Sequence, residues 1–159
     1  MKKHLSQSLS VIALAGSALL LSFTACSRAP ELPPKAVEIT GDDKMKYNIE
    51  GFEVAAGQKV AVTLKNVGTA PKASMGHNFI ALKLNVNGLK FVEAGSMYAG
   101  KDYVAPETEK DVIAKTKLLG PGESDTVTFT APYVKGRYEF VCSFPGHFGG
   151  GMKGIMTVQ

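Results

Sequence analysis

Short runs in which hydrophobic and polar residues alternate recur along most of the chain. In residues 59–67 (KVAVTLKNV), for example, Val60, Val62 and Leu64 alternate with polar or small residues, which is the period of a strand with one buried face. Turn-forming sequences such as AAGQ and GPGES separate the runs. The pattern predicts about eight strands, at residues 37–40, 46–54, 59–67, 77–84, 113–119, 125–131, 137–142 and 154–158.

Residues 87–105 depart from this alternation. They contain helix-forming residues, with Leu89, Val92 and Met97 roughly on one face, and they predict a short helical insertion between two strands. The remaining pattern predicts an all-β domain over residues 37–159, folded as an antiparallel Greek-key β-sandwich. A chain of roughly 120 residues is long enough to form a single two-layer core.

The first 36 residues lack this pattern, and we expect them to lie outside the folded domain. Residues 1–25 begin with a short basic region followed by an apolar stretch, which is typical of a secretory signal peptide. The sequence LSFTAC at its end resembles a bacterial lipobox, although Phe23 stands where leucine is usual, and cleavage there leaves a lipidated Cys26. Residues 26–36 are rich in proline and predict an extended linker. We therefore expect a lipoprotein on the periplasmic side of the bacterial cell envelope, with a soluble periplasmic protein as the alternative.

The composition argues against a nucleic-acid partner and for a metal. The formal net charge is only +4, and no run of Lys and Arg interleaved with aromatic residues occurs. The chain has two cysteines, and assigning Cys26 to the lipid leaves Cys142 without a disulfide partner. In an oxidising compartment a free thiol is a liability unless it is buried or bound to a metal. Cys142 is therefore a candidate metal ligand.

The sequence YEFVCSFPGHFGGGMKG surrounds this cysteine and carries two further donor residues. Cys142, His147 and Met152 follow one another at intervals of five positions, in a stretch whose proline and glycines predict a loop between two strands. His77 is the only other histidine outside the leader. Two imidazoles and a thiolate with a weak methionine form the ligand set of a blue-copper electron-transfer site. The pattern predicts a single copper ion that alternates between Cu(I) and Cu(II).

Other interpretations of these residues remain open. Taken singly, a cysteine, histidine or methionine in a folded domain is more often an ordinary structural residue. Two His and one Cys also suit tetrahedral zinc, although Met is a poor zinc donor. A copper storage or delivery protein without an electron-transfer role is the main functional alternative, but such proteins usually carry more accessible Met or His, and the six methionines here are scattered. A copper oxidase needs more histidines than two, or a second cysteine beside the first, so we do not expect an enzyme.

Three segments closely resemble the azurin-like cupredoxins, which are type 1 blue copper proteins: MGHNF, KDYVAPETEKDVIAKTKLLGPGESDTVTF and CSFPGHFGGGMKG. The resemblance implies three strong, roughly trigonal ligands and one distant axial ligand, namely His77, Cys142 and His147 with Met152 as the axial one. The resemblance also implies that the protein shuttles electrons between redox partners.

The resemblance implies further roles around the metal. The carbonyl of Gly76 is expected on the side opposite the methionine, Asn78 is expected to hold the ligand loop and donate toward the thiolate, and the amide of Phe144 is expected to donate to the same sulfur. Azurins have one residue fewer between the second histidine and the methionine, so the spacing here is nearer to plastocyanin or auracyanin. The cysteines of the disulfide that azurins carry near the N-terminus are absent.

Apolar residues near the ligands predict a docking surface. Met75, Pro145 and Phe148 are expected to form an apolar rim over an edge of His147, and an exposed apolar patch is a plausible contact for a partner protein. The expected partners are redox proteins, in particular c-type cytochromes or other haem proteins.

Overall fold

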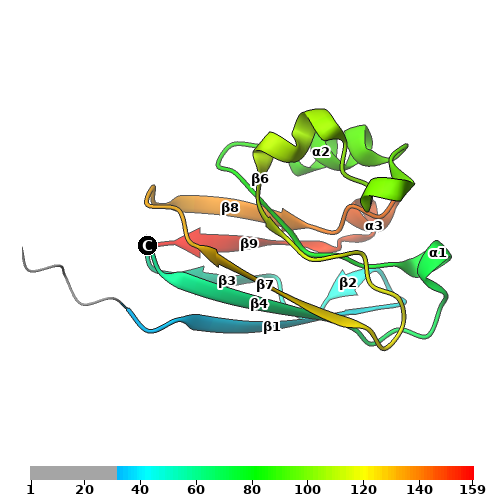
Figure 1. Cartoon of the computed structure of the whole chain (residues 1–159), viewed down its shortest axis with the longest axis horizontal. Coiled ribbons are helices and arrows are strands. Elements are labelled where there is room, and N and C mark those ends of the chain that lie inside the picture. The colour runs from blue at the N-terminus through cyan, green and yellow to red at the C-terminus, as the bar shows by residue number, and fades with distance from the viewer. Residues whose placement is uncertain (1–31) are drawn as a thin grey trace, which may run out of the picture. The chain divides into compact units, whose positions relative to one another are not determined.

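The computed structural model describes residues 32–159, and within them two β-sheets face each other (Figure 1). The first sheet has the strand order β2 (Lys46–Tyr47), β1 (Lys35–Asp42), β4 (Lys59–Asn66) and β7 (Ser124–Thr130). The second has the order β3 (Gly51–Val54), β9 (Lys153–Val158), β8 (Gly136–Val141), β5 (Ile80–Leu82) and β6 (Val112–Lys115). The predicted signal peptide and the predicted lipidation site at Cys26 lie outside the described residues.

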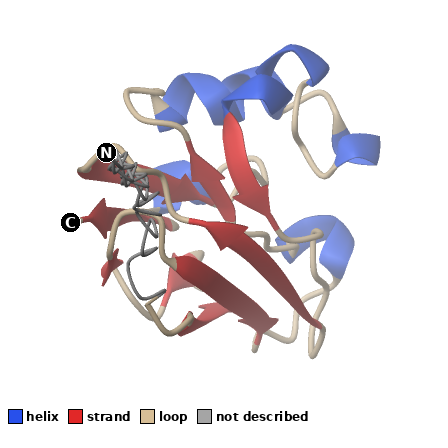
Figure 2. Cartoon of the chain, turned by 60° about the vertical axis from the view of Figure 1, so that its left-hand side comes forward, coloured by secondary structure: helices blue, strands red, loops and turns tan. Residues whose placement is uncertain are grey.

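The helices of the described part are short and lie outside the two layers of strands (Figure 2). They are α1 (Lys72–Met75), α2 (Gly88–Gly95) and α3 (His147–Gly150), with 3₁₀ turns at Ala99–Lys101 and Pro106–Asp111. The side chain of Asn87 caps α2 by accepting from the amide of Lys90, which satisfies one of the free donors at a helix start. No helix in this part of the chain is long and apolar enough to cross a membrane.

The β-sandwich and its helical insertion are confirmed, but the two sheets are mixed, and the predicted antiparallel pairing is wrong for two pairs of strands. β1 runs parallel to β4, from Lys35↔Val60 to Gly41↔Asn66, and β3 runs parallel to β9. The cause lies in residues 46–54, which form two strands that belong to different sheets. Because the chain crosses to the second sheet and back between β1 and β4, β4 can lie beside β1 in the same direction.

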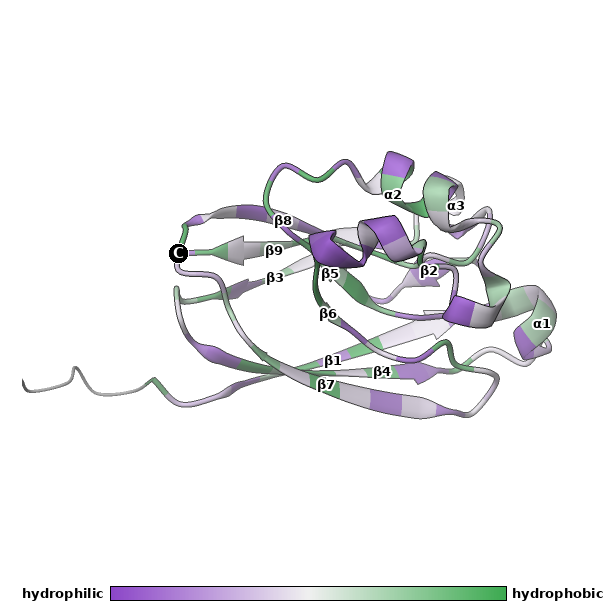
Figure 3. Ribbon diagram, turned by 45° about the horizontal axis from the view of Figure 1, so that its top comes forward, coloured by the Kyte–Doolittle hydropathy of each residue, from purple (hydrophilic) through white to green (hydrophobic). Residues whose placement is uncertain are grey.

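The space between the sheets is filled by one large hydrophobic core. The alternation predicted for β4 is confirmed, since Val60, Val62 and Leu64 are fully buried and the residues between them are not. The mixed colouring of the strands in Figure 3 reflects this alternation. Phe140 lies at the centre of the core, with its ring 5.3 Å from that of Phe79. Close packing of this kind makes the sandwich a stiff support for any site built on it.

A second, smaller hydrophobic cluster lies under α2. It consists of Ile80, Leu82, Phe91, Val104 and Val141, with half-buried Val86, Val92, Val112 and Phe148 packed against it. Alternate side chains of a strand point to opposite faces, so the strands that contribute Ala81 and Phe140 to the main core contribute their neighbours to this one. Helix α2 therefore covers the outer face of the second sheet.

Candidate metal centre

The predicted ligands come from two segments that meet at one end of the sandwich. Cys142 directly follows β8, His147 begins α3, and Met152 directly precedes β9. The backbone closes this loop, because the amide of Cys142 donates to the carbonyl of Met152 (3.1 Å) and the amide of Met152 donates to that of His147 (2.9 Å). His77 lies between α1 and β5, and Figure 1 shows α1 and α3 at the same end of the domain.

Three donor atoms are brought together in the interior. Nδ1 of His147 lies 3.2 Å from Nδ1 of His77 and 3.5 Å from Sγ of Cys142. The three donor atoms lie within 4.8 Å of one another, and the side chains are at most 1% exposed. Nitrogen and sulfur bind zinc, an ion of similar size to copper, at about 2.0 and 2.3 Å, which requires donor atoms roughly 3–4 Å apart. The spacing of the cluster fits one such ion.

Burial sets the protonation of these side chains. It lowers the pKa of His147 to about 4, with the nearby His77 adding to the effect, and it lowers the pKa of His77 as well. Burial raises the pKa of the Cys142 thiol to about 11, against the opposing effect of hydrogen bonds from the backbone amides of Asn78 and Phe144. At neutral pH both imidazoles are therefore neutral and able to bind a metal, whereas the thiol must lose a proton to do so.

The carbonyl of Gly76 and the side chain of Met152 both lie at this cluster. The Gly76 oxygen is 4.0 Å from Sγ of Cys142, and Met152 is fully buried. A Cβ placed on Gly41 in β1 would lie 2.5 Å from Cε of Met152 and 3.0 Å from Cδ2 of His77. The end of Met152 and the ring of His77 therefore both pack on the bare backbone of Gly41. The sequence analysis missed this residue, although a glycine within a strand is a known sign of close backbone approach.

A polar network joins the two ligand segments behind the cluster. The side chain of Asn78 accepts from the amide of Ser143 (2.9 Å) and donates to Oγ of Ser143 (2.8 Å) and to the carbonyl of Asp102 (3.1 Å). Oγ of Ser143 in turn donates to the same carbonyl (2.7 Å). Because Asn78 follows His77 and Ser143 follows Cys142, the network fixes one ligand segment against the other. Ser143 and Asp102 have no signature in the sequence that marks them for this role.

The three residues predicted to form an apolar rim are in different environments. Pro145 is exposed and Met75 is half-buried, while Phe148 is half-buried against the second cluster under α2. The aromatic ring that stacks on His147 is that of Phe144, with ring centroids 4.6 Å apart. A docking role for the rim stays a prediction.

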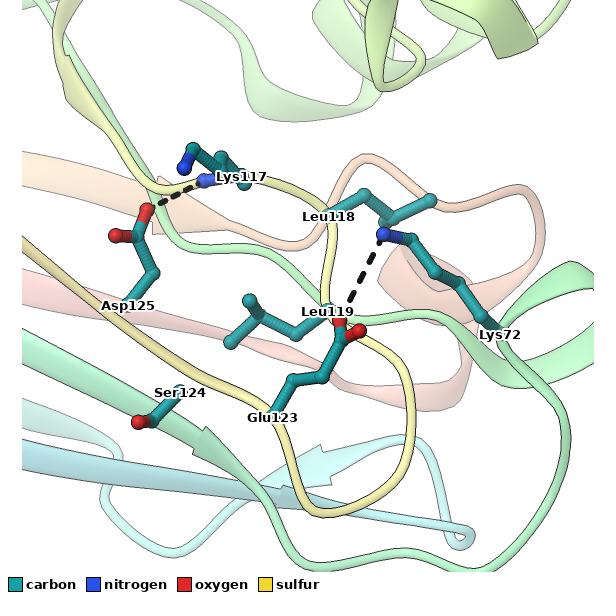
Figure 4. Close-up of a pocket in the computed structure, with 7 residues that line it drawn as sticks. All are labelled: Lys72, Lys117, Leu118, Leu119, Glu123, Ser124 and Asp125. Carbon is teal, nitrogen blue, oxygen red and sulfur yellow. Dashed lines mark hydrogen bonds and ion pairs between the residues drawn. The ribbon is translucent and has the colours of Figure 1, made fainter.

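A surface hollow of about 390 Å³ lies between Lys72 and the segment 117–125 (Figure 4). Its floor includes Leu119, which exchanges two backbone hydrogen bonds with His77, of 3.0 and 2.7 Å. An ion pair between Lys72 and Glu123 (3.7 Å) spans the hollow. Both side chains are about half exposed, so the pair adds little stability. The hollow is lined by Lys72, Lys117, Leu118, Leu119, Glu123, Ser124 and Asp125.

The fold and the buried donor cluster together define a cupredoxin. Residues 35–159 match the family of copper binding proteins described as the plastocyanin/azurin family, and the chain belongs to this family. It is 40% identical over 149 residues to azurin from Bordetella pertussis, covering 91% of this chain and 95% of that protein. It is 39% identical over 126 residues to outer membrane protein H.8 from Neisseria gonorrhoeae, covering 77% of this chain and 67% of that protein.

Solved structures agree with this assignment. The crystal structure of dithionite-reduced auracyanin from Roseiflexus castenholzii superposes with a TM-score of 0.69 and 38% identity, covering 79% of this chain and 97% of the auracyanin. The expected resemblance to azurin-like cupredoxins is therefore confirmed, and copper is confirmed as the cofactor.

Proposed function

We propose that this chain is a single-copper electron carrier of the bacterial cell envelope. In this proposal His77, Cys142 and His147 are the strong ligands, with Met152 and the Gly76 carbonyl on the two axial sides. One observation carries it: two imidazole nitrogens and a thiol converge within 4.8 Å in a nearly solvent-free position. We do not propose an enzymatic activity.

The residues around the cluster favour electron transfer because they keep it in one arrangement. Two nitrogen donors and one sulfur suit both oxidation states without matching the preferred geometry of either. The stiff sandwich, the Asn78–Ser143–Asp102 network and the Gly41 backbone all restrict the movement of the donors. Bound copper supplies the one-electron couple. The amides of Asn78 and Phe144, which face the Cys142 sulfur, stabilise its thiolate form.

The location is proposed from the leader and from the names of the relatives. A signal peptide at residues 1–25 and a lipid on Cys26 would attach the protein to a membrane on its periplasmic side, in keeping with outer membrane protein H.8 as a relative. β1 runs from Lys35 to Asp42, and Gly41 near its far end touches the cluster. A strand rises by about 3.3 Å per residue, so the chain enters the domain roughly 20 Å from the copper site.

The partners are proposed to be haem proteins such as c-type cytochromes, which would approach over Met75 and Pro145. In the structure, the side chain of Pro145 is exposed and that of Met75 is half-buried. Apolar surface close to a buried metal lets a partner dock within a short distance of it.

The visible absorption spectrum of the protein after addition of Cu(II), before and after ascorbate, tests this function. An intense blue band that bleaches on reduction and returns on oxidation supports a thiolate–copper redox site. The Cys142→Ser variant serves as the control and is expected to lose the intense colour, since the sulfur is its source. Stoichiometric copper binding without colour would contradict the proposal and favour storage or delivery, and intense colour in the Cys142→Ser variant would refute the ligand assignment.

A further inference from the structure

The segment between His147 and Met152, which we call the ligand arm, has only one side chain of any size. Its sequence is Phe148 followed by three glycines, and Gly151 adopts a positive φ of 98°. The amide of Gly150 donates to the carbonyl of Gly146 (3.0 Å), just ahead of the arm, and the amide of Gly151 donates to the carbonyl of Phe148 (3.1 Å). Glycine loses more conformational freedom on folding than any other residue, so the arm needs a contact outside itself to stay in one conformation.

Phe148 makes that contact. Its ring packs against the second hydrophobic cluster, which includes Phe91 of α2 and Val141 of β8. On another side, Nζ of Lys153 lies 4.0 Å from the ring centroid, within the range of a cation–π interaction. Gly150 also lies close to the Met45 side chain, but Phe148 supplies the only side chain of the arm that packs into a hydrophobic cluster of the domain.

The start of α2 is shaped to accept the ring. A Cβ placed on Gly88 would collide with the carboxylate of Glu139 and would lie 2.9 Å from Cε2 of Phe148, closer than two carbons normally approach. The amide of Gly88 donates to Oε2 of Glu139 (3.0 Å), which fixes this end of the helix on β8. Because Gly88 has no side chain, Phe148 can lie directly against the helix backbone.

We propose that Phe148 is a positioning residue for the copper site, through which α2 and β8 hold His147 and Met152 in place. The proposal rests on the ligand roles given above. The anchor lies on the side of the arm that faces α2, and it gives Phe148 a task different from partner docking.

Hydrogen exchange in the copper-free protein tests the anchor without reference to the metal. The variant Phe148→Ala is compared with Val112→Ala, which removes an apolar side chain from the same cluster but outside the arm. In Phe148→Ala the amides of Gly150 and Gly151 are expected to exchange about tenfold faster, while the amides of β4 keep their rates, as local opening requires. Unchanged exchange rates in the arm would overturn the proposal. Faster exchange throughout the domain, as in a general loss of stability, would overturn it too.

Copper retention tests the consequence for the site. Loss of a residue that orients metal ligands typically weakens metal binding by about 10–100-fold, so Phe148→Ala is expected to release copper faster by a factor in this range and to shift the blue band. Phe148→Leu keeps an apolar anchor of similar size and is expected to stay within about threefold of the wild type. If Phe148→Ala released copper at the same rate as the wild type, the positioning role would be overturned. Absence of a blue band in the wild type would instead count against the proposed function, and the exchange experiment would still decide on the anchor.

A second variant separates contact from general packing. Gly88→Ala adds a methyl group against both the Glu139 carboxylate and the Phe148 ring. It is expected to speed copper release in the wild type and to have a clearly smaller effect in Phe148→Ala, where only the contact with Glu139 remains. Equal effects of Gly88→Ala in both backgrounds would show that the two residues act independently and would contradict the proposal.

Discussion

Replacing Gly41 by alanine tests the close contact beneath the copper site. The added Cβ would lie 2.5 Å from Cε of Met152, 3.0 Å from Cδ2 of His77 and 3.2 Å from Cγ of His77. Carbon atoms pack at about 3.5–4.0 Å, so the methyl group of Met152 must move by about 1 Å and the His77 ring by about 0.5 Å. Inserting a methyl group into a tight core typically costs about 1–3 kcal/mol. Because alanine restricts the unfolded chain more than glycine does, the substitution regains about 0.4–1 kcal/mol. The net destabilisation is then about 1.3 kcal/mol at the midpoints of the two ranges.

The assay compares Gly41→Ala with Gly149→Ala. Gly149 lies in the ligand arm, but a Cβ there meets no atom within 4 Å and its φ is not positive. Urea unfolding of the copper-free proteins gives the free energies of unfolding, and the visible spectrum and reduction potential of the copper-loaded proteins report on the ligands. Gly41→Ala is expected to change the free energy of unfolding, the visible spectrum and the reduction potential. Gly149→Ala is expected to change none of these by a comparable amount. Wild-type stability, spectrum and potential in Gly41→Ala would refute the contact.

The remaining predictions concern the donors themselves. Met152→Gln is expected to keep copper but to shift the reduction potential, because the axial ligand tunes it; an unchanged potential argues against an axial role. Copper binding at pH 7 is expected to release about one proton per ion, since the Cys142 thiol has a pKa of about 11 and both imidazoles are neutral. Calorimetry in buffers of different ionisation enthalpy measures the number of protons released. Binding without proton release would contradict this protonation of the ligands. The copper-free protein is expected to lose stability as the pH falls from about 6.5 to about 4. The pKa of His147 is about 4 in the folded state and about 6.5 in the unfolded one, so protonation favours unfolding, by at most about 3 kcal/mol. Urea unfolding across this range checks it, with His147→Gln as the control, which is expected to keep only the part of the effect that comes from the lowered pKa of His77.

The fold was largely predictable because its signal is local. Alternation of buried and exposed residues in β4 follows directly from the strand period, and the helix formers after Asn87 predict α2. The pairing of β1 with β4 was not predictable in the same way. Alternation shows which face of a strand is buried, but it does not show which neighbour the strand has or in which direction that neighbour runs.

The candidate metal ligands in the loop could be found from the sequence for a similar reason, but the residues that hold them in place could not. Cys142, His147 and Met152 lie in one short loop, so their spacing alone brings them together. Gly41 and Asp102 reach the site only through the tertiary fold, and no pattern within their own segments points to a metal.

X-ray absorption at the copper edge of the copper-loaded protein, oxidised and reduced, tests whether His77, Cys142 and His147 bind the metal in one rigid arrangement. We expect two nitrogen donors and one short sulfur donor in both states, with nearly unchanged distances, because His77, Cys142 and His147 are held in place by the fold. A coordination shell without sulfur, or one that exchanges a ligand on reduction, would contradict it.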